Sequence, residues 1–433
     1  MSTDIFNKEI NKKQSLDFPL QYNYQLEKFI KVMNVVLLFY LCIYGTIIIY
    51  YDGMIFRSLK DVVMLIISLL SIVLIVSRKY MYNDLKVILF FLFYITIFGL
   101  IGHLMTGTPL NYIYGFKVTI LPLLMLFLGY ILRGKSVSDL IILFKFLYVL
   151  IISVWVIQYI LGIEKLMELG FVYGVNVRNF GQEIPRLPSL VGIPSAYGML
   201  LAVLGIMVER NDKLCQRYVL VRWLVKINTL VFLLLSTQRT SIIFWVVTQI
   251  CMFVFYIRNS LRQKQLLILS ATFLIVPFIV IVIANFDTRL YSTSSFSHRL
   301  EHWFIHLPYL FSFEGLLGLG LGAVGAATIR VHQLGYDVSN YYVDNQFFAF
   351  YQQGGILGTI LWIIFLMLIM YKLISNYLLN EKKSFKNIEV TALSMLIGVF
   401  IAGFFTNTLE VFPFNVFFWM FIGIALSINN QKK

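Results

Sequence analysis

Long apolar runs without charged residues are the feature that most restricts how this chain can fold. About 20 apolar residues in a helix cross the roughly 30 Å hydrocarbon core of a bilayer, and runs near that length recur along the sequence. Only 13% of the 433 residues are charged, whereas soluble globular proteins carry about 25%. A soluble cytoplasmic enzyme is therefore excluded. The runs also lack the alternation of membrane strands, so we expect an all-α polytopic membrane protein.

The apolar runs predict about 12 transmembrane helices. They lie near residues 29–50, 62–76, 86–105, 118–132, 140–161, 189–208, 219–236, 241–257, 266–284, 345–371, 390–408 and 411–427. We place a tight turn at 236–241, because the apolar stretch around it is too long for one crossing. The predicted organisation is an N-terminal tail at 1–28, spans 1–9 within 29–284 with an outer loop at 162–188, a large extracytoplasmic loop at 285–344, spans 10–12 within 345–428 and a tail at 429–433.

The basic residues predict the orientation of the chain. Most of the 35 lysines and arginines fall in the tails and loops of one side, whereas the 21 acids divide about evenly. Because positively charged loops remain in the cytoplasm, both termini are expected there, in a bacterial cytoplasmic membrane. The net charge of +14 then reflects orientation and contact with anionic lipid headgroups, and it gives no indication of nucleic acid. The polar N-terminus leads into a full-length span, so no cleavable signal peptide is expected.

Four cations on the predicted outer side are candidate site residues. They are Lys117 in GFKVTILP, Arg186 in GQEIPRLPSLVG, Arg239 in STQRTS and Arg299 in FSHRLEHW. A charge in an apolar protein is costly and is kept where a charged partner compensates it. Guanidinium groups bind phosphate oxygens in a bidentate fork, so converging arginines suit a lipid-linked pyrophosphate. The alternative is that each cation reaches the interface alone or caps a helix.

Three histidines, His298, His302 and His306, recur every four residues along one helical stripe. Such spacing is compatible with zinc. However, no carboxylate or cysteine completes a ligand set on that face, so we expect no metal. A stripe that faces lipid headgroups is the simpler interpretation. One of these histidines, His302, is also a candidate base, because imidazole titrates near neutral pH.

Asp344, in YYVDNQFFAFYQQGGILG, lies where the large loop returns to the membrane. A carboxylate at an apolar boundary tends to have a raised pKa and can accept a proton from a sugar hydroxyl. The alternative is a helix cap, because Asp and Asn are preferred at that position. The two interpretations are compatible, and the sequence leaves both open.

The run GLLGLGLGAVGAA matches GxGxxG at Gly320, Gly322 and Gly325. A dinucleotide fingerprint needs a strand before it and a helix after it, within a βαβ unit. The run instead lies in a predicted extracytoplasmic loop, so we reject a nucleotide site. We expect these glycines to let the backbone approach a neighbouring segment closely.

Taken in order, these motifs resemble a known family. RLPSLVGIPSAYG, STQRTS, HRLEHW, LLGLGLG and DNQFFAFYQQGGILG follow one another as in the bacterial O-antigen and capsule polymerase (Wzy) and O-antigen ligase superfamily. The likeness covers most of the chain, from GFKVTILPLL to GGILG. It implies a GT-C-like helical glycosyltransferase that acts on undecaprenyl-pyrophosphate-linked glycans at the outer face, without a nucleotide sugar, cofactor or essential metal.

The resemblance also implies roles for individual residues. Arg186, Arg239 and Arg299 match the pyrophosphate-facing arginines of the family. Many relatives have histidine where this chain has Asp344, which leaves the base undecided between Asp344 and His302 and favours a polymerase over a ligase. Aromatic side chains are expected to stack on sugars, or to form an interfacial belt, at Trp303, Tyr341 and Tyr342. A chain-length regulator and a flippase are expected partners, and a transporter of lipid-linked oligosaccharide is the alternative class.

Overall fold

The protein was analysed as a computed structural model that describes residues 3–51, 53–77, 83–106, 109–132, 135–180, 184–256, 312–333, 344–379 and 383–427. Within these ranges, six helices are long and apolar enough to cross a membrane: Gln25–Tyr50, Ile55–Ser77, Leu85–His103, Pro109–Ile131, Ser136–Glu168 and Gln346–Leu379. Shorter apolar helices cover Arg239–Phe255, Asn387–Ala402 and Phe414–Ser427. The expectation of a helical membrane protein is thus confirmed in this general form.

The helices follow one another along the chain with few strands between them. They are α1 Thr3–Tyr50, α2 Met54–Ser77, α3 Asn83–Thr106, α4 Pro109–Gly115, η1 Phe116–Ile120, α5 Leu121–Ile131, α6 Lys135–Glu168, η2 Ser189–Val191, α7 Pro194–Asn211, α8 Lys213–Arg217, α9 Val219–Leu235, α10 Arg239–Tyr256, α13 Phe313–Leu317, α14 Ala326–Gln333, α15 Gln346–Leu379, α16 Lys383–Ala402, η4 Thr408–Glu410 and α17 Phe414–Ser427. Every predicted span except 266–284 overlaps one of them, and 266–284 lies outside the described residues.

The helix predicted to begin at Ser189 begins five residues later. Residues Ser189–Val191 form a single 3-10 turn, Ile193 is extended, and α7 starts at Pro194. Proline disfavours helical geometry in the residue before it and fits the first turn of a helix, where its missing N–H is not needed. An irregular segment therefore separates Arg186 from α7.

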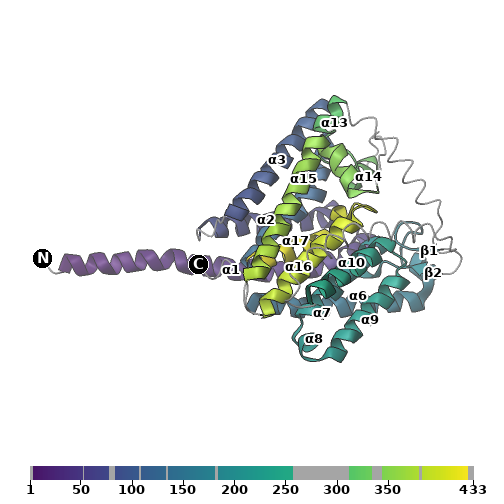
Figure 1. Ribbon diagram of the computed structural model, residues 1–433, viewed down its shortest axis with the longest axis horizontal. Helices are drawn as coiled ribbons and strands as arrows, with labels where there is room; N and C mark the ends of the chain where they lie inside the picture. The colour runs from purple at the N-terminus through teal and green to yellow at the C-terminus, as the bar shows by residue number, and fades with distance from the viewer. Residues whose placement is uncertain are drawn as a thin grey trace.

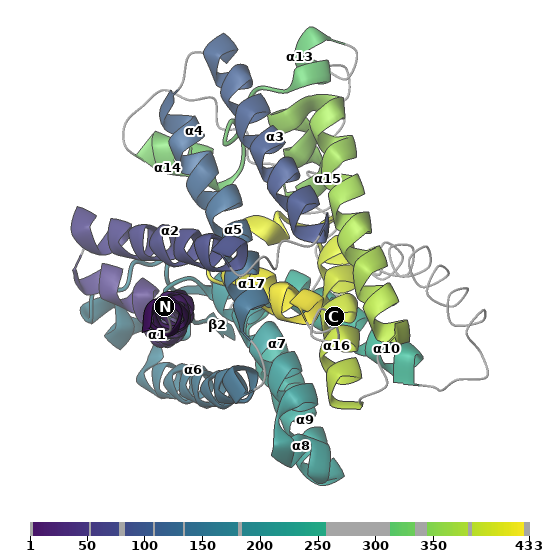
Figure 2. The same cartoon turned by 90° about the vertical axis from the view of Figure 1, so that its left-hand side faces the viewer.

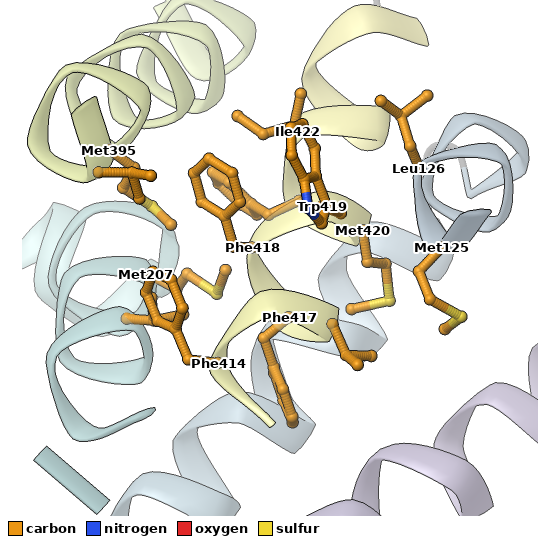
Figure 3. Close-up of a cluster of buried hydrophobic side chains, with 14 of the residues drawn as sticks. Met125, Leu126, Met207, Met395, Phe414, Phe417, Phe418, Trp419, Met420 and Ile422 are labelled. Carbon is orange, nitrogen blue, oxygen red and sulfur yellow. The ribbon is translucent and has the colours of Figure 1, made fainter. Parts of the chain in front are cut away.

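The core lies where α5 and α17 cross. A Cβ at Gly129 would overlap the Met420 carbonyl oxygen, and a Cβ at Gly423 would overlap that of Leu126. Small residues that let two backbones approach closely are typical of helix packing in membranes. Large side chains from α17, including Phe414, fill the space toward α5, α7 and α16 (Figure 3).

The two ends of the molecule differ in character. The first part of α1 projects from the body as a single helix, and the strands β1 (Arg178–Phe180) and β2 (Ile184–Arg186) lie at the opposite end of the long axis (Figure 1). Helices α3 and α15 run side by side, with α13 beside α15 and α14 beside α4 (Figure 2). The two groups of cations described below lie around the C-terminal end of α1, opposite its projecting N-terminal part.

Candidate functional site

The structure describes four of the predicted site residues, Lys117, Arg186, Arg239 and Asp344. The other five, Arg299, His302, Trp303, Tyr341 and Tyr342, lie outside the described residues, as do His298 and His306. Their assignments stay predictions. The geometry of the site is therefore built from the first four residues and their neighbours.

A short hairpin in the loop predicted to be extracytoplasmic brings two arginines into register. Strands β1 and β2 pair antiparallel, and Arg178 is directly opposite Arg186 in their register. Side chains at opposite positions of an antiparallel pair point to the same face, with Cβ atoms about 5 Å apart. Arg178 was missed in the sequence, although Gly181 between two short polar-apolar runs is compatible with a hairpin turn. This hairpin adds a small β element to the all-α prediction.

The STQRTS turn holds Arg186 from the other side. The Arg186 Nε donates a hydrogen bond to Thr237 Oγ1 (2.6 Å), and its Nη2 donates to the Thr237 carbonyl oxygen (3.1 Å). Thr237 has a φ of 54°, a left-handed conformation that is unusual for a β-branched residue and strained. Such strain persists where surrounding contacts over-determine it, and it concentrates at functional sites. The turn therefore serves as a fixed support for the guanidinium group.

Two other arginines affect the pKa of Arg186. Burial, and to a lesser extent the charges of Arg178 and Arg239, lower the pKa of Arg186 to about 10. Arg239 lies two residues after Thr237, the residue that Arg186 contacts, and Arg178 lies opposite Arg186 in the strand register. Like charges gathered at one place raise the local positive potential, which attracts a polyanion. We call Arg178, Arg186 and Arg239 the arginine group.

The irregular segment after Arg186 is anchored inside the membrane domain. The Ser189 N–H donates to Gln158 Oε1 (2.8 Å), and Gln158 Nε2 donates back to the Ser189 carbonyl (3.0 Å). The Ser189 hydroxyl donates to the Ile151 carbonyl (2.6 Å). Buried backbone groups that leave a helix need such partners. A glutamine and a serine from sequence-distant positions therefore fix the chain just beyond Arg186.

Lys117 lies in a different group of charges. It belongs to the π-helical turn η1, and its Nζ is 2.6 Å from Asp61 Oδ2 on α2. The same carboxylate pairs with Lys60 at 2.5 Å. Lys117 was predicted to join the arginines in one site, whereas its ion pair places it with Lys60. We call Lys60, Asp61 and Lys117 the lysine group. Lys60 and Asp61 were not predicted as site residues, because charges at the start of a span resemble ordinary interfacial residues.

Asp344 precedes α15, but Asn345 supplies the cap. Asn345 Oδ1 accepts hydrogen bonds from the backbone N–H groups of Phe347 (2.9 Å) and Phe348 (3.2 Å). This is the pattern of an N-cap side chain, and it assigns that role to Asn345. The half-buried Asp344 stays a predicted base.

The glycine run packs closely against its neighbours, as predicted. A Cβ at Gly320 would crowd the backbone of α3, a Cβ at Gly322 would overlap the Asn111 carbonyl, and one at Gly325 would overlap the Glu410 carboxylate. All three have positive φ, which favours glycine. The run follows helix α13 directly and leads into α14, so no strand stands immediately before it, and it lacks the geometry of a dinucleotide fingerprint.

Glu410 is a buried carboxylate that was not predicted. It accepts hydrogen bonds from the Ala326 N–H (3.0 Å) and from Gln353 Nε2 (3.1 Å). Burial raises the pKa of Glu410, and these hydrogen bonds partly offset that effect. Glu410 thereby ties the turn between α16 and α17 to the first residue of α14. The only sequence signal for this contact is that Glu410 lies between two apolar runs.

Comparison with known proteins adds no assignment. No known protein family matches this chain, and no curated protein has a significantly similar sequence. Within the described ranges, no group of three or more histidine, cysteine, aspartate or glutamate residues is arranged to hold a metal ion. The two groups of cations in a chain with several apolar helices therefore carry the functional argument.

Proposed function

We propose that the protein is a membrane glycosyltransferase of about 12 spans that polymerises undecaprenyl-pyrophosphate-linked repeat units into O-antigen or capsular polysaccharide. The reaction takes place at the outer face of the cytoplasmic membrane. The observation that supports this most is the arginine group. Arg186 is bonded to a strained turn, Arg178 is opposite it in the strand register, and Arg239 follows two residues after Thr237, so cations flank one turn beside apolar helices, where a lipid-linked pyrophosphate presents its charge.

The proposed reaction is an inverting substitution at the anomeric carbon. A hydroxyl of the acceptor sugar attacks this carbon of the glycan on a second lipid. A new glycosidic C–O bond forms as the bond between the anomeric carbon and the phosphate oxygen breaks, and undecaprenyl pyrophosphate leaves. The arginine group, with Arg299 of the large loop 285–344, stabilises the negative charge that develops on the leaving pyrophosphate. Charge stabilisation of this kind is usually the largest contribution to such catalysis.

The proton of the attacking hydroxyl passes to a base in the large loop or next to it. Asp344 is the first candidate because it lies at the start of α15, and His302 is the second. Trp303, Tyr341 and Tyr342 supply stacking surfaces for sugar rings. A chain-length regulator and a flippase are the proposed partners, the first to set polymer length and the second to supply lipid-linked units.

The decisive experiment is elongation by the purified protein in lipid vesicles. Lipid-linked repeat units are supplied at the outer face, and products are separated by size. A ladder of lengths that remain linked to undecaprenyl pyrophosphate supports the polymerase. Transfer of glycan to a different acceptor without a ladder indicates a ligase, and movement of substrate across the vesicle without new bonds indicates a transporter. Both of these outcomes contradict the proposal.

A further inference from the structure

The lysine group places buried positive charge well within the outer part of the helices. Lys60 is 5% exposed, and it lies about two helical turns after the first residue of α2, which begins at Met54. Its Nζ is 4.8 Å from the centre of the Tyr44 ring and 4.5 Å from that of Phe412. An ionisable residue at such a position is expensive and is by default the mark of a functional site.

One carboxylate serves two ammonium groups in this cluster. Asp61 pairs with both Lys60 and Lys117, so the three side chains together retain one positive charge. Arg330 of α14 adds to the positive field at Lys60. The Lys117 side chain is 30% exposed, whereas Lys60 is enclosed. An anion can therefore approach through Lys117 and be held by the charge behind it.

The lysine group and the arginine group lie on two sides of α1. Tyr44 of α1 contacts Lys60. The next residues contact the segment that follows Arg186: a Cβ at Gly45 would overlap the Val191 carbonyl, and the Thr46 hydroxyl donates to the Leu190 carbonyl (2.9 Å). Three consecutive residues within one turn of α1 thus connect the lysine group with the segment that follows Arg186.

We propose that Lys60, Asp61 and Lys117 form a second lipid-pyrophosphate site, which holds the acceptor substrate while the arginine group holds the donor. The inference rests on the proposed function, because polymerisation requires two lipid-linked pyrophosphates at once. Only the donor pyrophosphate gains charge as its bond breaks, and the donor is assigned to the guanidinium groups, which offer more hydrogen bonds. The acceptor pyrophosphate is bound without reacting, for which compact ammonium groups suffice.

Equilibrium binding of undecaprenyl pyrophosphate to the purified full-length protein tests this inference. The wild-type protein is expected to bind two molecules, Lys117→Gln and Arg186→Gln one each, and the double variant none. Lys226→Gln is the matched control, because Lys226 also lies over an aromatic ring, that of Trp223 at 5.2 Å, on the side predicted to be cytoplasmic. Two tight sites in K117Q would overturn the proposal. Competition by inorganic pyrophosphate would confirm recognition of the phosphate group, whereas equal occupation by phosphatidylglycerol would show a general lipid site and overturn it.

Asp61→Asn distinguishes a binding site from an ion pair that only joins α2 to η1. The variant removes the carboxylate that competes with the ligand, so we expect the second site to bind several-fold more tightly. Unchanged or weaker binding by a folded D61N protein would contradict the proposal.

Elongation kinetics separate this inference from the proposed function. K117Q should raise the KM for a short acceptor and leave that for the donor unchanged, whereas two binding sites without any elongation would refute only the polymerase.

Discussion

The two cationic groups use opposite means to hold a charge inside an apolar protein. In the arginine group, two hydrogen bonds of Arg186 go to the hydroxyl and carbonyl of Thr237, which are neutral. In the lysine group, Lys60 and Lys117 share the carboxylate of Asp61. A neutral partner fixes the position of a charge without cancelling it. We therefore expect the arginine group to stabilise negative charge that develops during the reaction. The lysine group is stable without a ligand, and a bound anion would replace part of its ion pair.

The largest expected effect is on catalysis by the arginine group. Arg186→Gln should reduce the rate of elongation by about 10²–10³-fold, which is typical for removal of one group that stabilises developing charge. The ladder of products from purified lipid-linked units measures this. Arg217→Gln is the control, because Arg217 lies over Tyr218 in the short helix α8 and should leave the ladder unchanged. A normal product ladder in R186Q would show that Arg186 does not contribute to catalysis.

In the lysine group, the largest effect should be on stability. Asp61→Ala leaves two ammonium groups without their shared carboxylate, and breaking a buried pair in this way costs about 3 kcal/mol. Thermal unfolding in detergent should show a clearly lower midpoint. Glu27→Ala is the matched control, because the Glu27–Lys31 pair is more exposed and lies within one helix, where such a pair contributes about 0.5 kcal/mol or less.

Gly45→Ala tests whether α1 connects the two groups. The added methyl would overlap the Val191 carbonyl, and overpacking of this kind costs about 2 kcal/mol. We expect a lower unfolding midpoint and slower elongation, because the segment after Arg186 must move. Gly53→Ala is the control, since the nearest atom to its Cβ is a Phe56 side-chain carbon at 3.5 Å. Equal behaviour of the two variants would show that the close approach at Gly45 is unimportant.

Thr237→Gly should separate stability from activity. Glycine relieves the left-handed strain at φ 54°, an effect of about 1 kcal/mol, but it removes the hydroxyl that accepts from Arg186 Nε. We expect an unfolding midpoint equal to or above that of the wild type, together with several-fold slower elongation. Thr237→Ser keeps the hydroxyl and should retain activity. Full activity in T237G would mean that the carbonyl of residue 237 alone positions Arg186.

The smallest effect concerns Glu410 and pH. Because burial raises the pKa of Glu410 above its ordinary value of 4.5, the folded protein binds this proton more readily than the unfolded chain does. The contribution of this group to stability should therefore increase as pH falls through the folded pKa, and level off below 4.5. Glu410→Gln should lose that dependence in unfolding experiments across this range. An identical pH profile in both proteins would contradict the assignment.

Local chemistry made part of the arginine group predictable. Arg186 and Arg239 were recognised because each lies in a break between apolar runs, where a charge is conspicuous. Their convergence was predicted from the expected bilayer depth, and Arg186 contacts Thr237, two residues before Arg239. Arg178 was not recognised, because its importance arises from strand register. A register is set by pairing between two segments, and neither segment alone carries the signal.

The lysine group shows where such reasoning fails. Lys117 was recognised as a cation at the predicted outer end of a span, but its partner Asp61 belongs to another helix and was not recognised. The Asp344–Asn345 pair shows the same limit at short range. Both residues are good caps, and only the path of the chain into α15 decides that Asn345 accepts the two backbone hydrogen bonds.

The sequence by itself determined that the chain is helical and membrane-embedded, because apolar length and scarcity of charge are properties of each segment. It also determined that the glycine run serves close packing, because no βαβ pattern surrounds it. Only the tertiary structure decided which cations lie together, which carboxylate neutralises two of them and which turn is strained to hold a third. These features depend on contacts between distant segments, and a buried charge takes its chemistry from its neighbours in space.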